Sequence, residues 1–402
     1  MKEFKMLRAL AVICVLAGLL LPVFGQNPTA PQRPRRVPDP TGTGGTGATN
    51  TSGGQEVDDG DVVRVDTQLI SVPTVVVDKT GRPVVNLKPT DFAVFEDGKP
   101  QSIANFATTE APFEVALLLD TSGSTRDDVA LIRSAAQSFI SALRPGDRVA
   151  VLAFSSDVHG TTKLATIQVA TRLTSDRGTL RRAVESIGAS NGTPFYDGLM
   201  NIVESVFDSP PSPELRGRRA IVALTDGVDS ASMRDYNETR AKLRAADIAC
   251  YFIQVNTEDY VEDRLMGDCR DSGGLRLSRA QLQRYRRIFV PNGSASDFEN
   301  FCEMGPFERM SISRKLYQLA RIEMGEMAKT SGGKTFDAAT LNDAQAAFAQ
   351  VAKEIGTQYS LGYYSTNPAR DGGYRNIKVE LRGTAKGLQV RAREGYNSQR
   401  TN

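Results

Sequence analysis

The sequence predicts an α/β fold, in which a doubly wound, mostly parallel sheet is inserted between flanking β-strands that form a small β-sandwich. The first observation is a set of apolar runs that alternate with segments of helical periodicity, as in parallel sheets covered by helices on both faces. The second is the presence of strand-like segments, separated by turn residues, on both sides of this region. The apolar runs are Val115–Leu119, Val149–Phe154, Ala220–Thr225 and Ile248–Val255. At 402 residues, the chain is long enough for two or three domains.

Residues 1–25 have the organisation of a secretory signal peptide. Basic residues precede an apolar run from Ala9 to Leu21, which Pro22 ends. This run is shorter than the roughly 20 residues that a spanning helix needs, so we expect cleavage and no transmembrane span afterwards. An uncleaved membrane anchor is the alternative. Residues 26–60 are rich in Pro, Gly and Thr, which predicts a disordered linker.

Residues 61–110 and 358–398 contain the flanking strands. Their strand-like segments are Val62–Val77, Phe92–Phe95, Gln358–Ser365, Tyr374–Leu381 and Gly387–Arg393. Either group alone is marginal as an independent hydrophobic core. We therefore expect the two groups to pack together as one β-sandwich.

Residues 111–357 make up the expected α/β domain. Apolar periodicity and helix stop signals predict its helices. They are Asp127–Leu143, Asp176–Ile187, Phe195–Phe207, Asp235–Ala246, Arg314–Lys329 and Leu341–Ile355, with a short strand at Gly332–Phe336. A segment of about residues 257–312 is longer than the usual connection between elements. We interpret it as an insertion near the ligand face with a basic helix at Arg276–Arg287; a disordered loop is the alternative.

Histidine and cysteine are scarce, and this limits the chemistry. A single histidine, His159, leaves little for a zinc site built on histidines or for a Ser-His-Asp triad. Cys250 lies in an apolar run and predicts a buried thiol. Cys269 and Cys302 flank a polar segment, and whether they form a disulfide is left open. Cys14 lies within the signal peptide.

Three polar loops are placed where a doubly wound sheet forms its ligand site. Asp120, Ser122 and Ser124 follow the first apolar run and supply a carboxylate and two hydroxyls at two-residue steps. Thr193 lies just ahead of a helix, for which an N-cap role is the alternative. Asp226 ends a further apolar strand. Because the carboxyl ends of parallel strands meet at one sheet edge, we expect these five residues to converge there.

This pattern resembles the metal-ion-dependent adhesion site (MIDAS) of von Willebrand factor type A (VWFA) domains, and the resemblance covers the whole α/β domain. It implies that Ser122 and Ser124 bind a cation directly, that Asp120 and Asp226 hold it mostly through water, and that Thr193 binds in either way. Oxygen ligands suit Mg²⁺, or Mn²⁺ or Ca²⁺ in its place. The flanking strands look like those of a bacterial secreted VWFA-related subfamily.

We therefore expect a secreted or periplasmic, cell-envelope protein that is not an enzyme. It would bind a protein or cell-envelope ligand, because only two carboxylates surround the ion and an acidic side chain of the partner can complete its coordination. One alternative is a structural subunit of an envelope complex with a metal-stiffened loop. Another is a metal-dependent phosphatase-like hydrolase with Asp120 as nucleophile, although Ser122 stands where such enzymes have a second aspartate. A net charge of +2 without a basic stripe argues against nucleic acid.

Overall fold

The computed structural model describes residues 69–108, 112–125, 128–159, 162–209, 218–268 and 275–398. The predicted signal peptide and linker lie outside these residues, as does Cys269. Cys302 is disulfide-bonded, and its pairing with Cys269 stays a prediction. Cys250 is a buried free thiol, which confirms the expectation for this residue. Within the described ranges, no helix combines the length and the apolar character needed to cross a bilayer.

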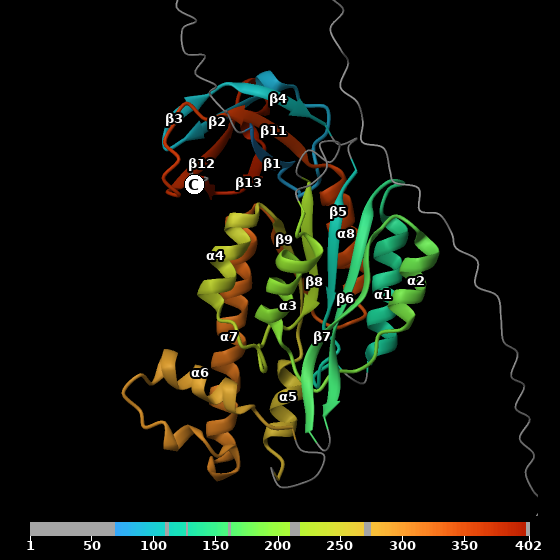
Figure 1. Cartoon of the computed structure of the whole chain (residues 1–402), viewed down its shortest axis with the longest axis vertical. Coiled ribbons are helices and arrows are strands. Elements are labelled where there is room, and N and C mark those ends of the chain that lie inside the picture. The colour runs from blue at the N-terminus through green and yellow to red at the C-terminus, as the bar shows by residue number, and fades with distance from the viewer. Residues whose placement is uncertain are drawn as a thin grey trace, which may run out of the picture. The chain divides into compact units, whose positions relative to one another are not determined.

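A six-stranded sheet forms the centre of the α/β region (Figure 1), and it confirms the doubly wound, mostly parallel fold. Its strands, in spatial order, are β10 (Lys334–Ala338), β9 (Ala249–Val255), β8 (Arg219–Thr225), β5 (Glu114–Leu119), β6 (Arg148–His159) and β7 (Thr162–Thr174). All neighbours are parallel except β6 and β7, which form an antiparallel hairpin. The predicted set of strands did not include β7. Its alternation of apolar and polar residues from Ala165 to Val169 is a strand signal that was available in the sequence.

Helices cover both faces of this sheet. One face carries α1 (Val129–Ala142), α2 (Arg177–Glu185) and α8 (Ala344–Gly356). The other carries α3 (Phe195–Asn201), which continues as a π-helical turn at Ile202–Val206, together with α4 (Tyr236–Ala246) and α7 (Pro306–Ser331). The helix expected at Arg314–Lys329 is thus longer in the structure, because Pro306 is suited to the first turn of a helix and extends α7 at its N-terminal end.

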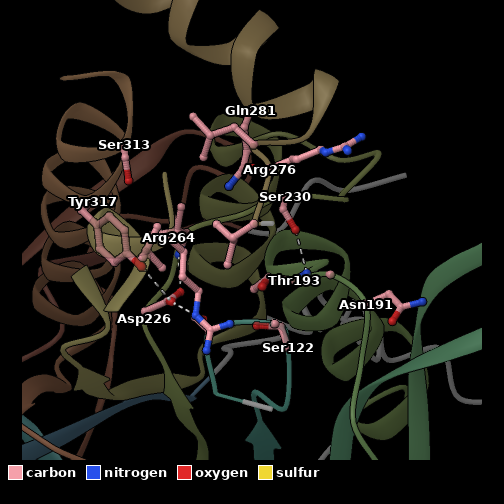
Figure 2. A pocket seen from close by; sticks show the side chains of 17 residues that line it. Ser122, Asn191, Thr193, Asp226, Ser230, Arg264, Arg276, Gln281, Ser313 and Tyr317 are labelled. Carbon is pink, nitrogen blue, oxygen red and sulfur yellow. Dashed lines mark hydrogen bonds between the residues drawn. The ribbon is translucent and has the colours of Figure 1, made fainter. Parts of the chain in front are cut away.

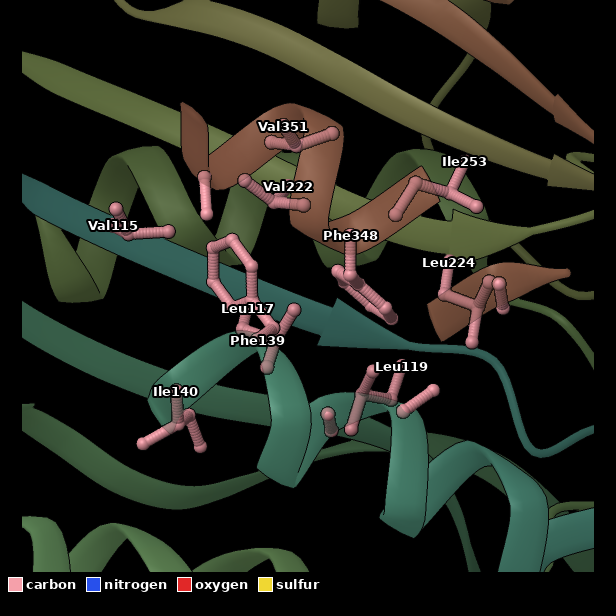
Figure 3. Close-up of a cluster of buried hydrophobic side chains, with 14 of the residues drawn as sticks. Val115, Leu117, Leu119, Phe139, Ile140, Val222, Leu224, Ile253, Phe348 and Val351 are labelled. Carbon is pink, nitrogen blue, oxygen red and sulfur yellow. The ribbon is translucent and has the colours of Figure 1, made fainter. Parts of the chain in front are cut away.

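The sequence of β5 is continuously apolar, without alternation, because the strand is buried on both faces. Val115, Leu117 and Leu119 point to the face that carries α1 and α8, where they pack with Phe139 and Phe348 (Figure 3). The intervening residues of β5 are buried in the cluster on the opposite face. Both faces of the strand therefore need apolar side chains, as in other parallel sheets.

Two four-stranded antiparallel sheets form the β-sandwich. One has the order β13 (Gln389–Ala392), β1 (Leu69–Val77), β11 (Tyr359–Tyr364) and β4 (Ile103–Ala107). The other has the order β14 (Gly395–Asn397), β12 (Tyr374–Leu381), β2 (Phe92–Glu96) and β3 (Lys99–Gln101). In the first sheet, strands from the two ends of the chain alternate, and in the second sheet the two groups meet where β12 pairs with β2. Neither group can therefore complete its hydrogen bonding alone. The sheets share one apolar core, in which the rings of Phe92 and Tyr359 lie 5.3 Å apart.

The long segment after β9 is helical where the structure describes it. It contains α5 (Glu258–Leu265) and α6 (Arg279–Phe289). The chain also has short 3-10 helices at Ser296–Phe298, Phe301–Glu303, Pro89–Asp91 and Gly383–Gly387. The expected basic helix begins at Arg279 rather than Arg276, because Ser278 and Gln281 form a capping box that fixes its start. A separate apolar cluster, which includes Leu265, Leu282 and Leu316, joins this segment to α7.

Candidate metal centre and its pocket

The candidate site lies at the carboxyl ends of β5 and β8, where the chain order of the sheet reverses. From β5 the chain proceeds to β6 on one side, whereas β8 and β9 lie on the other. Asp120 follows β5 directly and Asp226 follows β8 directly. Ligand sites of doubly wound sheets form at such a point because the loops of neighbouring strands part there.

Asp120 is buried beneath the surface of the site. One carboxylate oxygen accepts a hydrogen bond from the Ser122 backbone amide at 3.0 Å, and the other accepts one from the Thr225 hydroxyl at 2.6 Å. Burial raises the pKa of Asp120 to about 7, and the nearby Asp226 carboxylate adds to the rise. Two carboxylates placed together out of water favour a bound cation, which compensates their charges.

Asp226 receives hydrogen bonds from three different parts of the chain. Its Oδ2 accepts from the hydroxyl of Ser124 at 2.8 Å and from the hydroxyl of Thr257 at 2.7 Å. The Tyr317 hydroxyl lies 3.5 Å from the same oxygen and 2.7 Å from the Thr257 hydroxyl. The backbone amide of Val228 donates to Oδ1 at 3.0 Å. The carboxylate is therefore fixed in direction before any ligand arrives.

Thr193 reaches the site on the loop that precedes α3. Its backbone amide donates to the Ser230 hydroxyl at 2.8 Å, and its carbonyl oxygen accepts from the Ser230 amide at 3.0 Å. The Thr193 hydroxyl makes no hydrogen bond within the described part of the chain, although the residue is only 5% exposed. The amide of Phe195, at the start of α3, donates instead to Asp229 at 2.9 Å. The N-cap alternative for Thr193 is thus wrong, and its hydroxyl is available to a ligand.

Four of the five expected ligands line one pocket of about 300 Å³ (Figure 2). They are Ser122, Ser124, Thr193 and Asp226. Asp120 does not line the pocket. It lies behind Ser122 and accepts a hydrogen bond from the Ser122 backbone amide. The structure thus brings the three predicted loops together at one edge of the sheet.

The donor set fits a hard, hydrated cation. It consists of three hydroxyls and two carboxylates, with no sulfur or nitrogen ligand, a chemistry that Mg²⁺ accepts when it keeps some of its waters. Among the described residues, no group of three or more His, Cys, Asp or Glu side chains is placed to hold a metal. A cation here would therefore depend on the Ser122, Ser124 and Thr193 hydroxyls as much as on carboxylates.

Three further residues contact the candidate ligands and were not predicted from the sequence: Thr225, Thr257 and Tyr317. Thr257 follows β9 at the same sheet edge as Asp120 and Asp226, so the rule that selected those residues also applies to it. Tyr317 lies on α7, 91 residues from Asp226, and no spacing in the sequence marks it.

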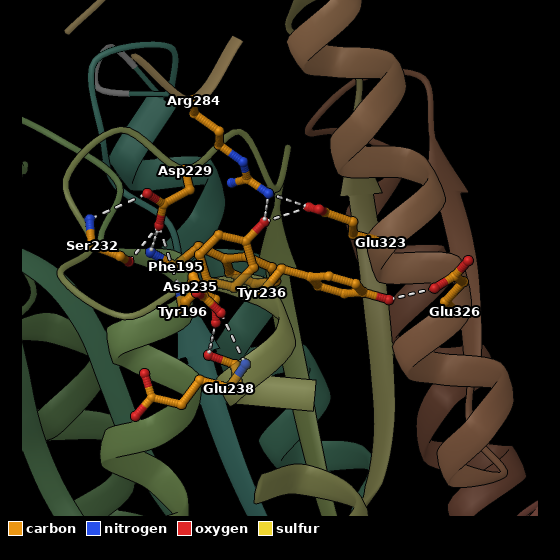
Figure 4. Close-up of polar contacts among 11 residues, drawn as sticks. Phe195, Tyr196, Asp229, Ser232, Asp235, Tyr236, Glu238, Arg284, Glu323 and Glu326 are labelled. Atoms are coloured by element: carbon orange, nitrogen blue, oxygen red, sulfur yellow. Dashed lines mark hydrogen bonds and ion pairs between the residues drawn. The ribbon is translucent and has the colours of Figure 1, made fainter. Parts of the chain in front are cut away.

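A second polar cluster connects the helical segment to the helix behind Thr193 (Figure 4). The Tyr196 hydroxyl on α3 donates to Glu323 on α7 at 2.5 Å. Arg284 on α6 pairs with Glu323 at 2.5 Å and donates to the Tyr196 oxygen at 2.6 Å. Burial raises the pKa of Tyr196 well above its usual value. This cluster fixes α6 over the domain and so helps to place the walls of the pocket.

The family comparison agrees with this architecture. Residues 114–272 match the model of the von Willebrand factor type A domain, a range that includes all five candidate ligands. No curated protein sequence matches the chain. Among solved structures, the von Willebrand factor type A protein from Catenulispora acidiphila is 11% identical, covering 82% of this chain and 74% of its own, with a TM-score of 0.38. The pilus adhesin SpaC from Lactobacillus rhamnosus GG is 10% identical, covering 79% and 49%, with a TM-score of 0.37. The SpRpn10 VWA domain is 15% identical, covering 36% and 76%, with a TM-score of 0.29.

Proposed function

Because residues 114–272 form a von Willebrand factor type A domain, we propose that the protein is a secreted, non-enzymatic binding module of the cell envelope. It captures a protein or cell-envelope ligand through a divalent cation. Asp120, Ser122, Ser124, Thr193 and Asp226 hold this cation, with Mg²⁺ the best match to their chemistry.

The observation that carries the proposal is the convergence of three separate loops on one pocket. Hydroxyls of Ser122, Ser124 and Thr193 line it together with the Asp226 carboxylate. A bound divalent ion supplies an electrophilic centre to which an acidic side chain of the partner can bind. The two carboxylates nearby do not exceed its charge, so a carboxylate of the partner can replace one of the waters on the ion.

Adhesive binding is favoured over hydrolysis by the way Asp120 is held. Its two oxygens accept hydrogen bonds from the Ser122 amide and the Thr225 hydroxyl, and the residue is 1% exposed. A carboxylate behind the pocket wall is poorly placed to attack a substrate. It is well placed to orient Ser122 and to balance the charge of an ion.

Cation binding is the first test. The intact protein should bind Mg²⁺ or Mn²⁺ in the micromolar to millimolar range by isothermal titration calorimetry, and Asp120→Ala should abolish the binding heat. Asp263→Ala is the matched control, since Asp263 is an exposed carboxylate on α5 and its loss should leave the affinity unchanged. Absence of cation binding by the intact protein contradicts the proposal.

Ligand capture is the second test. Envelope proteins or wall fragments retained by the immobilised protein in Mg²⁺ should be released by EDTA. Capture that persists in EDTA favours the alternative of a structural subunit, in which the ion only stiffens a loop.

A further inference from the structure

The pocket extends beyond the five candidate ligands, and the helical segment after β9 builds this extension. Arg264 on α5 and Arg276 ahead of α6 both line it, together with apolar side chains of Val261, Leu275 and Leu277. The two arginines are exposed, and Arg264 stacks on the Tyr260 ring at 4.1 Å. These residues come from the long segment rather than from the loops that carry the candidate metal ligands.

The charges of this pocket call for more than one negative group on the ligand. Its described lining holds one carboxylate, Asp226, and two guanidinium groups, Arg264 and Arg276. A divalent cation balances the charges of Asp226 and of the Asp120 carboxylate behind Ser122. One carboxylate on the cation leaves the Arg276 guanidinium without an anionic group of the ligand, and a guanidinium group pairs well with a second carboxylate.

An unused hydroxyl points to the same conclusion. Ser313 is 1% exposed and lines the pocket, and its Oγ has no hydrogen-bond partner among the residues that the structure describes. It precedes Tyr317 by one helical turn, so both side chains lie on the face of α7 that borders the site (Figure 2). Because leaving a buried hydroxyl unpaired is costly, an acceptor on a ligand would gain affinity from it.

We infer that the pocket recognises a dicarboxylate: one carboxylate completes the coordination of the cation and the second pairs with Arg276. Ser313 donates a hydrogen bond to the buried part of the same ligand. A volume of about 300 Å³ suits acidic side chains or a small acid rather than a folded surface. This inference rests on the proposed function, which supplies the cation.

The test compares glutarate with glutaramate, in which an amide replaces one carboxylate with little change of shape. With the full chain in saturating Mg²⁺, ligand-observed NMR titration should show glutarate binding at least about fivefold more tightly than glutaramate. Arg276→Gln should remove this preference without changing the Mg²⁺ affinity. Arg279→Gln is the control, since Arg279 is an exposed arginine of α6 paired with Glu299 and outside the pocket.

Ser313→Ala provides a second, independent variant. It should weaken glutarate binding several-fold and leave thermal stability unchanged or raised, because it removes an unpaired buried hydroxyl. A capped acetyl-Asp-Gly-Asp-amide peptide distinguishes the two sources of the dicarboxylate: tighter binding than glutarate indicates a protein ligand, and weaker binding indicates a free acid. Either result supports the inference.

Equal affinities for glutarate and glutaramate overturn the inference, as does an Arg276→Gln variant that keeps the preference. In both cases Mg²⁺ binding by the intact chain is still observed, so the proposed function survives. Failure of the chain to bind Mg²⁺ at all contradicts the proposed function, and the dicarboxylate inference then falls with it.

Discussion

Replacing Thr257 by valine tests how the candidate metal site is held. The Thr257 hydroxyl donates to Asp226 at 2.7 Å and contacts the Tyr317 hydroxyl at 2.7 Å. Valine keeps the shape of the side chain and removes only this hydroxyl. Among the described residues, the Tyr317 hydroxyl then keeps its 3.5 Å contact with Asp226 as its link to the site.

The expected magnitude follows from the hydrogen bonds on Asp226. Ser124 also donates to its Oδ2, and the lone pairs of the Ser124 oxygen remain available to a cation while it does so. Thr257 and the Val228 amide supply the other short hydrogen bonds to the carboxylate, at 2.7 and 3.0 Å. A hydrogen bond to a charged group contributes about 1.5–3 kcal/mol, so losing its orienting effect should weaken Mg²⁺ binding about tenfold.

Calorimetric titration of Mg²⁺ into wild type, Thr257→Val and Thr257→Ser measures this effect, and serine should retain most of the affinity. Thr239→Val is the matched control. Thr239 is a fully buried threonine whose hydroxyl donates to the Asp235 carbonyl, so this change should lower stability without altering the Mg²⁺ affinity. An affinity of Thr257→Val within twofold of wild type refutes the role assigned to Thr257.

Three further predictions concern stability and reactivity. Glu96→Gln should lower the free energy of unfolding by about 1–3 kcal/mol in urea titrations, because the buried carboxylate accepts hydrogen bonds from three hydroxyls. Glu380→Gln, at an exposed position of β12, should have little effect. In the ion-free protein, the pKa of Asp120 is raised from 3.8 to about 7, so the folded state retains a proton that the unfolded state has lost. The free energy of unfolding should therefore fall as pH rises from about 4 to about 7, and Asp120→Asn should flatten this decline. Burial raises the pKa of Cys250 to about 12, so iodoacetamide should leave it unmodified in the folded protein at neutral pH and alkylate it after unfolding, as read by mass spectrometry.

The candidate site was predictable from sequence to the extent that it depends on strand ends. Asp120 and Asp226 each follow an apolar run directly, and parallel strands place such residues at one edge of the sheet. Thr257 lies two residues after the end of β9 at the same edge. It was missed because a threonine after a strand carries less chemical signal than an aspartate. The positions of Tyr317 and Ser313 in the site could not be predicted from strand ends. Their place in the pocket depends on how α7 packs over the site, which no local pattern records.

The fold, too, was predictable in some elements and not in others. The sandwich followed from strand-like segments at both ends of the chain, each too small to fold alone. The edge strand β7 was missed although part of it alternates between apolar and polar residues. Continuous apolar runs identify strands that are buried on both faces, whereas β7 is only half-buried. The start of α6 was displaced because Arg276 continues the basic pattern, whereas the capping box at Ser278 decides where the helix begins.

Helix α7 connects the candidate site to the β-sandwich. In the N-terminal half of α7, Tyr317 contacts the site through Asp226, and at the C-terminal end Gly332 lies against the sandwich. Gly332 adopts a left-handed conformation with φ of 82°, and a Cβ atom there would come within 2.7 Å of the Arg393 backbone nitrogen. The Glu394 amide also donates to the Thr330 carbonyl at 3.2 Å. A single helix of 26 residues is thus anchored to the sandwich at one end and borders the pocket near the other. The flanking strands therefore do more than cap the sheet: they fix one end of the helix that carries two of the pocket's side chains.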